Sequence, residues 1–270
     1  MTVAALCTSL LTDQSAFASP GGAGATPPLP TIGEYSPLHS RVVNDGRAMS
    51  PGKQKAWTAR LRATNQGRRV ALAAATTKSL AEPLYVQKTG YYCGPTTLAM
   101  VTTYLGVGWG GSQGTQQDSA ANLLGTTSDG TAWYGSDNVP SFPKSSWYPM
   151  EDALNYRLYR VGKSTWYDHV SLPDTPTSAQ QVDFRDHLTF DIDQGYPGED
   201  NQYSIPGYQI GFQPSGTWYH WWSARGYANS GEITYFNDPA SWSQGRMSSE
   251  TTRGGKGTVV MALGARGYIW

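Results

Sequence analysis

The sequence has few residues of the kinds that bind metals or take part in redox chemistry. It contains two cysteines and four histidines among 270 residues, and no two histidines have the spacing typical of a zinc site. Asp191 and Asp193 are not followed by a glutamate at the offset that a calcium loop requires. The glycine-rich segment 254–258 lacks the spacing of a phosphate loop. We therefore expect no metal ion and no cofactor.

Charge and long apolar runs are also scarce. Only 15% of the residues are charged and the formal net charge is zero, so composition gives no electrostatic reason to bind nucleic acid or an anionic membrane. Beyond the first residues, no apolar run is long enough to span a bilayer. The abundant residues are instead Gly (31), Tyr (17) and Trp (10). This composition favours a loop-rich, strand-containing secreted protein over a helical bundle.

The first 18 residues resemble a secretory signal. An uncharged apolar run over residues 1–11 is followed by Ala16-Phe17-Ala18, an A-x-A pattern that predicts cleavage after Ala18. The usual basic segment is missing, which leaves the start codon open and keeps a buried N-terminal strand as the alternative. A lipid anchor on Cys7 is disfavoured because Leu6 stands where a small residue is required. We expect a secreted, extracellular protein, with cell-wall association left open.

Residues 19–81 form an N-terminal arm that differs from the rest of the chain. The arm begins rich in Gly and Pro, and residues 41–69 hold eight basic residues and one acidic residue. Residues 70–270 hold 12 basic and 17 acidic residues. This opposite charge suggests a propeptide held on an acidic body, anchored by Trp57, Leu61 and Leu72 on a helix and covering part of a cleft. The alternative is a solvated arm.

The central motif of the chain surrounds Cys93. Apolar residues recur at helical spacing after Gly94, Gly106 ends the run, and Pro95 suits a first helical turn. Cys93 is therefore expected at or just before a helix N-terminus, where free N–H groups and the helix dipole favour a thiolate. If Cys7 leaves with the signal, Cys93 has no disulfide partner, which indicates a reactive thiol rather than an inert buried cysteine. Gln87 lies on the non-helical arm upstream, where its amide can donate to an oxyanion.

The remaining pattern predicts an α+β domain. Helices are expected at 116–124, at 150–158 and from Ser178, which forms a capping box with Gln181. Strands are expected at 208–212, 219–224, 233–236 and 258–263, all later in the chain. Residues 126–147 should form a surface loop whose aromatic residues, Trp133 among them, line the rim of a substrate cleft.

A predicted hairpin brings a histidine and a carboxylate together. Residues 228–231 form a turn between two strands, so His220 should lie opposite about residue 239, with Asp238 as its neighbour. Asn237 is the rival orienting residue, but it points to the other face of its strand. Trp218 and Trp222 near His220 are expected to form a substrate wall, with core packing as the alternative. The other histidines, His39, His169 and His187, are expected in a solvated arm, in a loop and on a polar helix face.

Three segments carry a resemblance to a known family. Gln87 followed by Tyr92-Cys93-Gly94-Pro95, the segment 220–227 and Asn237-Asp238-Pro239 resemble, in order, the corresponding elements of the C39-like branch of papain-fold cysteine peptidases. The resemblance covers roughly Leu84 to the C-terminus. It implies an α+β papain-like fold over residues 82–270, with an N-terminal catalytic helix packed on an antiparallel sheet.

The expected function is that of a secreted cysteine peptidase acting on a peptide or protein substrate. Cys93 attacks a carbonyl to form a thioester acyl-enzyme, His220 moves the proton, Asp238 orients His220, and Gln87 binds the oxyanion. Tyr92 and Gly94, which flank the thiol, are expected to contact the substrate together with the three tryptophans Trp133, Trp218 and Trp222. A thiol acyltransferase or amidase using the same site is one alternative. A non-catalytic, aromatic-rich module that binds the cell envelope is another, and the oligomeric state stays open.

Overall fold

The computed structural model describes residues 49–65, 76–135, 138–143, 145–204, 210, 213, 218–240 and 245–270. The expected signal peptide, His39, Leu72 and all of the strand expected at 208–212 except Ile210 lie outside the described residues. In the part of the chain that is described, no helix combines the length and the apolar character needed to cross a membrane.

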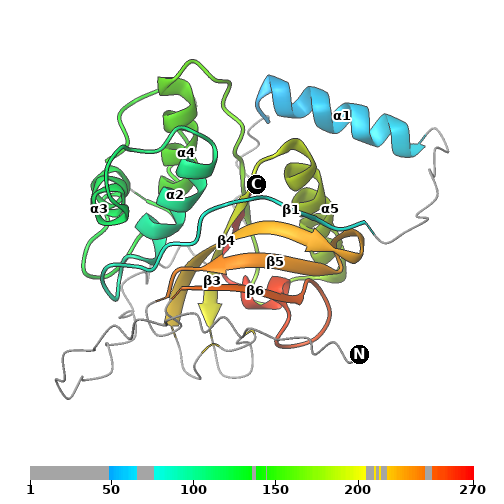
Figure 1. Ribbon diagram of the computed structural model, residues 1–270. Coiled ribbons are helices and arrows are strands. Elements are labelled where there is room, and N and C mark those ends of the chain that lie inside the picture. The colour runs from blue at the N-terminus through cyan, green and yellow to red at the C-terminus, as the bar shows by residue number, and fades with distance from the viewer. Residues whose placement is uncertain are drawn as a thin grey trace, which may run out of the picture.

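The described chain is a mixed structure of helices and one antiparallel sheet (Figure 1). The helices are α1 (Pro51–Asn65), α2 (Cys93–Tyr104), α3 (Gln113–Leu124), α4 (Pro149–Arg160), α5 (Ser178–Gln194) and α6 (Val259–Ala262). The strands are β1 (Lys78–Ser79), β2 (His169–Ser171), β3 (Gly198–Ser204), β4 (Trp218–Ala228), β5 (Ile233–Asp238), β6 (Arg246–Thr251) and β7 (Gly267–Ile269). The sheet order is β2-β7-β3-β4-β5-β6, and β1 also pairs with β4. Helices α2, α3 and α4 gather beside the sheet, where α2 packs against β4. The expected α+β class is confirmed.

The β4–β5 hairpin is the centre of the sheet. Its turn, η2 (Asn229–Gly231), has positive φ at all three residues, 49° at Asn229, 57° at Ser230 and 93° at Gly231. Ser, Asn and Gly in the sequence had indicated this turn. A register shift between Ala224 and Gly226 makes the hairpin asymmetric, which moves the residue opposite a given β4 position by one relative to a simple centred hairpin.

The helix boundaries follow their end signals closely. Helix α2 begins at Cys93, and Gly106 beyond its end has φ 69°. The capping box of α5 consists of Thr177 and Gln180, one residue earlier than expected, because the extended backbone of Thr177 makes it the N-cap. Gly195 ends α5 in the left-handed conformation.

The expected strand at 258–263 is wrong, because residues 259–262 form helix α6. All four of its residues are buried, and a short apolar run buried on every side has no periodicity that separates a helix from a strand. Strand β3, conversely, was not expected. Its segment from Glu199 to Gln202 is polar but fully buried, and burial raises the pKa of the Glu199 carboxyl well above its usual range.

Helix α1 of the N-terminal arm docks on α5 and the C-terminal residues. Trp57 makes edge contacts with His187, Phe190 and Trp270, with ring centroids 5.0 to 5.4 Å apart. Leu61, an expected anchor, is 46% exposed, so Trp57 is the anchor that the structure supports. The side chains that hold α1 therefore belong to a region remote in sequence from the Cys93 motif.

A buried lysine completes the docking of α1. Lys53 is fully buried, with Nζ 3.7 Å from a carboxylate oxygen of both Asp168 and Asp191 and 3.6 Å from the centre of the Trp270 ring. Burial raises the pKa of Asp191 to about 6, although Lys53 opposes this shift. A buried cation with two carboxylates is costly to separate, so α1 is part of the folded body.

His187 is not on a polar outer face. Its ring stacks on Trp270 with centroids 3.4 Å apart, and Nδ1 lies 2.9 Å from the Tyr268 hydroxyl. Burial lowers the pKa of His187 well below its usual value. The helix face that we expected to be solvated is the face covered by α1.

Candidate functional site

Cys93 is the first residue of α2 and is 4% exposed. Its N-cap, Tyr92, makes no side-chain capping bond, and no acidic residue occurs in the first turn. The positive end of the helix dipole therefore remains available to a charge at the sulfur. A cysteine at this position is a candidate nucleophile.

Gly94 allows a loop to pack against the start of α2. A Cβ at this position would lie 2.3 Å from Oγ1 of Thr131, a distance that no side chain can adopt. Thr131 is held in turn, since its hydroxyl lies 2.7 Å from that of Thr126 and its carbonyl accepts from Trp221 Nε1 at 3.2 Å. The glycine after Cys93 is thus required for packing, whatever contact it makes with a substrate.

His220 and Asp238 are in direct contact. His220 Nε2 lies 2.7 Å from Asp238 Oδ1, and both side chains are fully buried. Asp238 Oδ1 also accepts from the backbone N–H of Ala240 at 2.8 Å, which fixes the carboxylate. Because Nε2 is engaged by Asp238, Nδ1 is the ring nitrogen left for the thiol.

The charge state of His220 follows from these contacts. Burial alone would lower its pKa, but the Asp238 carboxylate, and after it the neighbouring Cys93, raise it to about 10. The imidazole is therefore protonated at neutral pH.

Asn237, the rival of Asp238, is engaged elsewhere. Its Nδ2 lies 3.4 Å from the carbonyl oxygens of Glu82 and Pro83. Asn237 is paired with Ser223 in the sheet, so neighbouring Asp238 points to the opposite face, where His220 lies. Asn237 and Asp238 therefore lie on opposite faces of their strand, as the sequence predicts.

Gln87 lies on the extended segment before α2 and is 3% exposed. Its Nε2 donates to the carbonyl of Thr89 at 2.8 Å, and its backbone N–H donates to the carbonyl of Pro239 at 2.8 Å. The second bond joins the Gln87 segment to the residue directly after Asp238. An amide Nε2 carries two hydrogens, so one remains for another acceptor.

Two of the three tryptophans expected at the substrate wall are core residues. Trp133 is 3% exposed and packs between Tyr148 and Trp221. Trp222 is fully buried, packs on Phe236 and donates through Nε1 to Gln202 at 3.2 Å. The structure thus supports the alternative, core packing, for Trp222, and the expectation that Trp133 lines a cleft rim is wrong. The expected aromatic rim is corrected accordingly, because the loop at 126–135 folds inward over β4.

Trp218 and Tyr92, which were also expected to contact the substrate, differ from each other. Trp218 lies in β4, but its side chain is outside the described residues. Tyr92 is partly exposed beside the thiol, with its ring 5.3 Å from that of Tyr91. Tyr92 is therefore the described aromatic side chain best placed to meet a substrate.

Sequence reasoning missed Gln117 of α3. This side chain is 2% exposed and bonds to the backbone on both sides of Gln87. It is about 30 positions away along the chain, and a glutamine in a helix gives no sequence signal of such a contact. Within the described part of the chain, no three His, Cys, Asp or Glu side chains form a group that could hold a metal ion.

A family model matches more than half of the chain. The model of the Peptidase_C39 like family matches residues 79–258, which include Gln87, Cys93, His220 and Asp238. A solved structure from Bacillus anthracis that is described as a C39-like peptidase is 14% identical, with a TM-score of 0.39, over 72% of this chain and 96% of that chain. No curated protein matches.

Proposed function

Since the chain belongs to the Peptidase_C39 like family, we propose that it is a secreted cysteine peptidase that hydrolyses peptide bonds through Cys93, His220 and Asp238. The observation that carries this proposal is the His220–Asp238 contact beside a cysteine at the first position of a helix. Neither a structural cysteine nor a binding module requires that combination.

The reaction begins from the thiolate–imidazolium pair. Cys93 Sγ forms a bond to the carbonyl carbon of the scissile peptide, and the carbonyl electrons move onto oxygen. The backbone N–H of Cys93 and the second hydrogen of Gln87 Nε2 donate to that oxyanion. His220 gives its Nδ1 proton to the leaving nitrogen, so the amine departs and a thioester remains.

Deacylation uses the same groups in reverse. Neutral His220 takes a proton from water, the hydroxide oxygen bonds to the thioester carbon, and the second tetrahedral intermediate collapses to release the acid and the Cys93 thiolate. Asp238 holds the ring through Nε2 and stabilises the imidazolium.

The test is a substitution of the nucleophile. Cys93→Ser should leave the fold intact and lose peptide-bond hydrolysis by at least about 10³-fold, because a serine hydroxyl at this position is far less acidic. Iodoacetamide should alkylate native Cys93 rapidly, as measured by mass spectrometry. Cys7→Ser makes the same chemical change at the other cysteine and should alter neither result. Hydrolysis by Cys93→Ser at the wild-type rate would exclude a thiol mechanism.

The proposed secretion has its own test. The A-x-A pattern ending at Ala18 supports export with signal removal. Expression of the full chain followed by cell fractionation and N-terminal sequencing should find extracellular protein that begins at Ser19. Intracellular protein with an intact N-terminus would exclude the proposed address without affecting the proposed chemistry.

A further inference from the structure

The segment that carries Gln87 is fixed by a single side chain of α3. The backbone N–H of Lys88 donates to Gln117 Oε1 at 2.8 Å, and Gln117 Nε2 donates to the carbonyl of Val86 at 2.9 Å. One primary amide therefore satisfies the backbone on both sides of Gln87, as a neighbouring strand would. The Gln117 side chain is buried, so water does not compete for these bonds.

Gln87 lies between the two residues that Gln117 binds, and its own backbone is held as well. Its backbone N–H donates to Pro239 on the sheet side, while Gln117 holds its neighbours on the helix side. These three bonds hold the backbone of Gln87 and of its two neighbours from both sides. Oxyanion donors act by being preorganised, and a displacement of about 1 Å can reduce the rate roughly 100-fold.

We propose that Gln117 is a positioning residue that fixes the oxyanion-binding amide of Gln87. This inference rests on the proposed peptidase activity. The two hydrogen bonds of Gln117 described above do not involve Cys93, His220 or Asp238. Its loss should therefore impair the oxyanion site and leave the thiolate–imidazolium pair as it is.

Gln117→Met has nearly the same length and loses both hydrogen bonds. Its kcat for peptide hydrolysis should fall by about 10- to 100-fold with KM changed less than about threefold. The rate of Cys93 alkylation by iodoacetamide should stay at the wild-type value. The neighbouring Asp118 supplies the control, because it pairs with the Lys88 ammonium at an exposed site. Asp118→Asn should leave kcat unchanged, since exposed ion pairs contribute little.

A double substitution separates positioning from general structural damage. In a Gln87→Ala background, Gln117→Met should lower kcat no further, because the amide that it positions is absent. A merely structural role would lower kcat in both backgrounds. Additive losses, an unchanged kcat in Gln117→Met, or an equal loss of alkylation would each overturn the proposal. If the wild type itself cleaves no peptide, the proposed function fails instead.

A second variant guards against failure to fold. In Gln117→Glu the neutral carboxylic acid can donate to Val86 and accept from Lys88, whereas the carboxylate can only accept. Relative to the wild type at the same pH, its kcat should therefore be higher at pH 5 than at pH 8. Equal relative activity at both values would contradict the need for a donor at this position.

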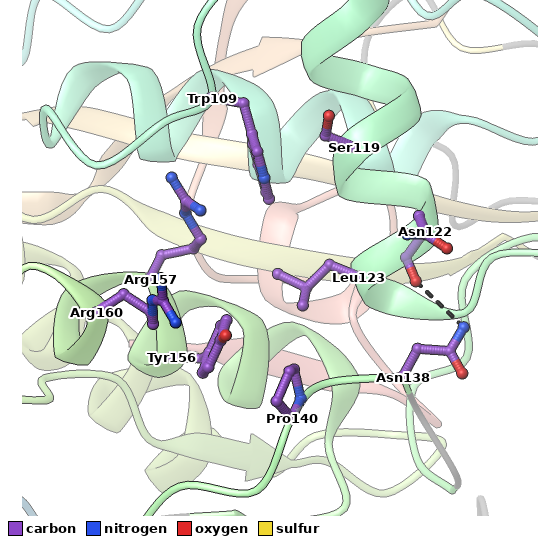
Figure 2. A pocket seen from close by; sticks show the side chains of 9 residues that line it. All are labelled: Trp109, Ser119, Asn122, Leu123, Asn138, Pro140, Tyr156, Arg157 and Arg160. Atoms are coloured by element: carbon purple, nitrogen blue, oxygen red, sulfur yellow. Dashed lines mark hydrogen bonds between the residues drawn. The ribbon is translucent and has the colours of Figure 1, made fainter.

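An independent observation concerns a cavity of about 550 Å³ between α3 and α4 (Figure 2). Figure 2 shows side chains of α3 facing those of α4, with Trp109 at one end and Asn138 at the other. The volume is within the range typical of small-molecule sites. The lining residues are Trp109, Ser119, Asn122, Leu123, Asn138, Pro140, Tyr156, Arg157 and Arg160.

The cavity is positively charged. Its described lining contains Arg157 and Arg160 and no acidic residue, and neither guanidinium pairs with a carboxylate among the described residues. Arg157 is fixed, with Nε and Nη2 each 2.7 Å from the carbonyls of Val107 and Gly108, and it stacks 4.4 Å from the centre of the Trp109 ring. A concave site lined by charge of one sign attracts the opposite charge.

The other lining groups indicate the kind of anion. Pro140 and Tyr156 line the cavity with apolar rings, and the Arg160 guanidinium lies 6.0 Å from the centre of the Tyr156 ring. Ser119, Asn122 and Asn138 line it with hydroxyl and amide groups, of which Asn138 Nδ2 donates to the Asn122 carbonyl at 3.1 Å. Ring faces stack on sugars, neutral amides exchange hydrogen bonds with hydroxyls, and a guanidinium takes a carboxylate through two parallel bonds. We infer that this cavity binds a saccharide unit that carries a carboxylate, with Arg160 as its charged partner.

The test uses glucuronate as the probe, with glucose and acetate as the two comparisons, followed by tryptophan fluorescence or ligand-observed NMR. Glucuronate should bind saturably and at least about tenfold more tightly than either comparison, since it alone uses both kinds of group. Arg160→Gln should weaken glucuronate binding about tenfold or more. Arg62→Gln, which removes an exposed arginine of α1, should not. Binding should persist in Cys93→Ser. Equal binding of glucose or of acetate, or no binding of glucuronate, would overturn the inference.

Discussion

The described part of the chain contains two buried histidine–carboxylate pairs that are nearly alike in geometry. His220 Nε2 lies 2.7 Å from Asp238 Oδ1, and His169 Nδ1 lies 2.6 Å from Glu151 Oε2. The side chains are 0% exposed in the first pair and at most 6% exposed in the second. Distance and burial alone would assign both pairs the same role.

The neighbours of the two pairs differ. The backbone N–H of His169 also donates to Glu151, at 3.1 Å, and its ring stacks on Tyr148 with centroids 3.5 Å apart. This second pair connects the first turn of α4 to β2. His220 instead lies close enough to Cys93 for that side chain to contribute to raising its pKa. A histidine–carboxylate pair therefore becomes a candidate catalytic site through the group beside the second nitrogen, not through the pair itself.

The largest expected effect distinguishes the carboxylate of Asp238 from that of Glu151. Asp238→Ala should lower kcat by about 10²- to 10⁴-fold, because the imidazolium loses its counter-charge and its orientation. Glu151→Ala should leave kcat within about threefold of wild type, since no reacting group is near it. Asn237→Ala is the matched control beside Asp238 and should cost much less. A comparable loss in Glu151→Ala would show that the second pair also takes part in the reaction.

The first pair was predictable from the sequence for a physical reason. A short turn fixes the register of a hairpin, so counting from residues 228–231 placed His220 near Asp238 even though a bulge shifts the register by one. The helix start at Cys93 is likewise encoded locally by Gly94 and Pro95. Local geometry of this kind can be derived from neighbouring residues alone.

The parts that were not predicted depend on contacts far apart in the chain. Gln117 meets Lys88, and Trp133 packs on Trp221, only after the helices have docked on the sheet. Strand β3 is polar, and its burial depends on the strands and helices that cover it. His169 was expected in a loop, and nothing in the sequence indicates its partner, Glu151, which lies 18 positions upstream.

The second-largest effect concerns α1, which docks beside the second pair. Lys53 meets Asp168, the residue before His169, and both backbone groups of Asp168 bond with Trp270. Removal of the arm leaves two buried carboxylates without their cation, which costs about 3–5 kcal/mol when a buried pair is broken. A chain starting at Ala81 should therefore be less stable or insoluble, as measured by thermal unfolding, compared with one starting at Ser19.

The same pair of chains tests whether the arm is an inhibitor. If α1 only stabilises the body, the truncated chain should show no rise in kcat at low or at high salt. If the truncated chain is more active and equally stable, the arm is an inhibitory propeptide instead. Lys53→Met retains the arm and should reproduce the loss of stability.

A smaller effect sharpens the structural role of the second pair. Glu151→Gln keeps the size of the side chain but removes its charge, so the bonds from the His169 ring and backbone become weaker. The free energy of unfolding should fall by about 1–3 kcal/mol, measured by urea denaturation, with hydrolysis unchanged. An unchanged stability would contradict the view that this pair joins α4 to β2.

The smallest expected effect is a shift in the pKa of His220, and a titration of its ring reports the charge of the first pair. The pKa of His220 is raised to about 10, so its imidazolium should persist through neutral pH and be lost as the pH rises through about 10. Because the folded value exceeds the unfolded value of about 6.5, the contribution of His220 to stability is complete below pH 6.5 and disappears as the pH approaches 10. NMR of the His220 ring should give a midpoint near 10 in the wild type and lower midpoints in Asp238→Asn and in Cys93→Ser, because both partners raise the value. Glu151→Gln should leave that midpoint unchanged. A wild-type midpoint near 6.5 would show that Cys93 and His220 do not form an ion pair, and the two histidine–carboxylate pairs would then differ in position alone.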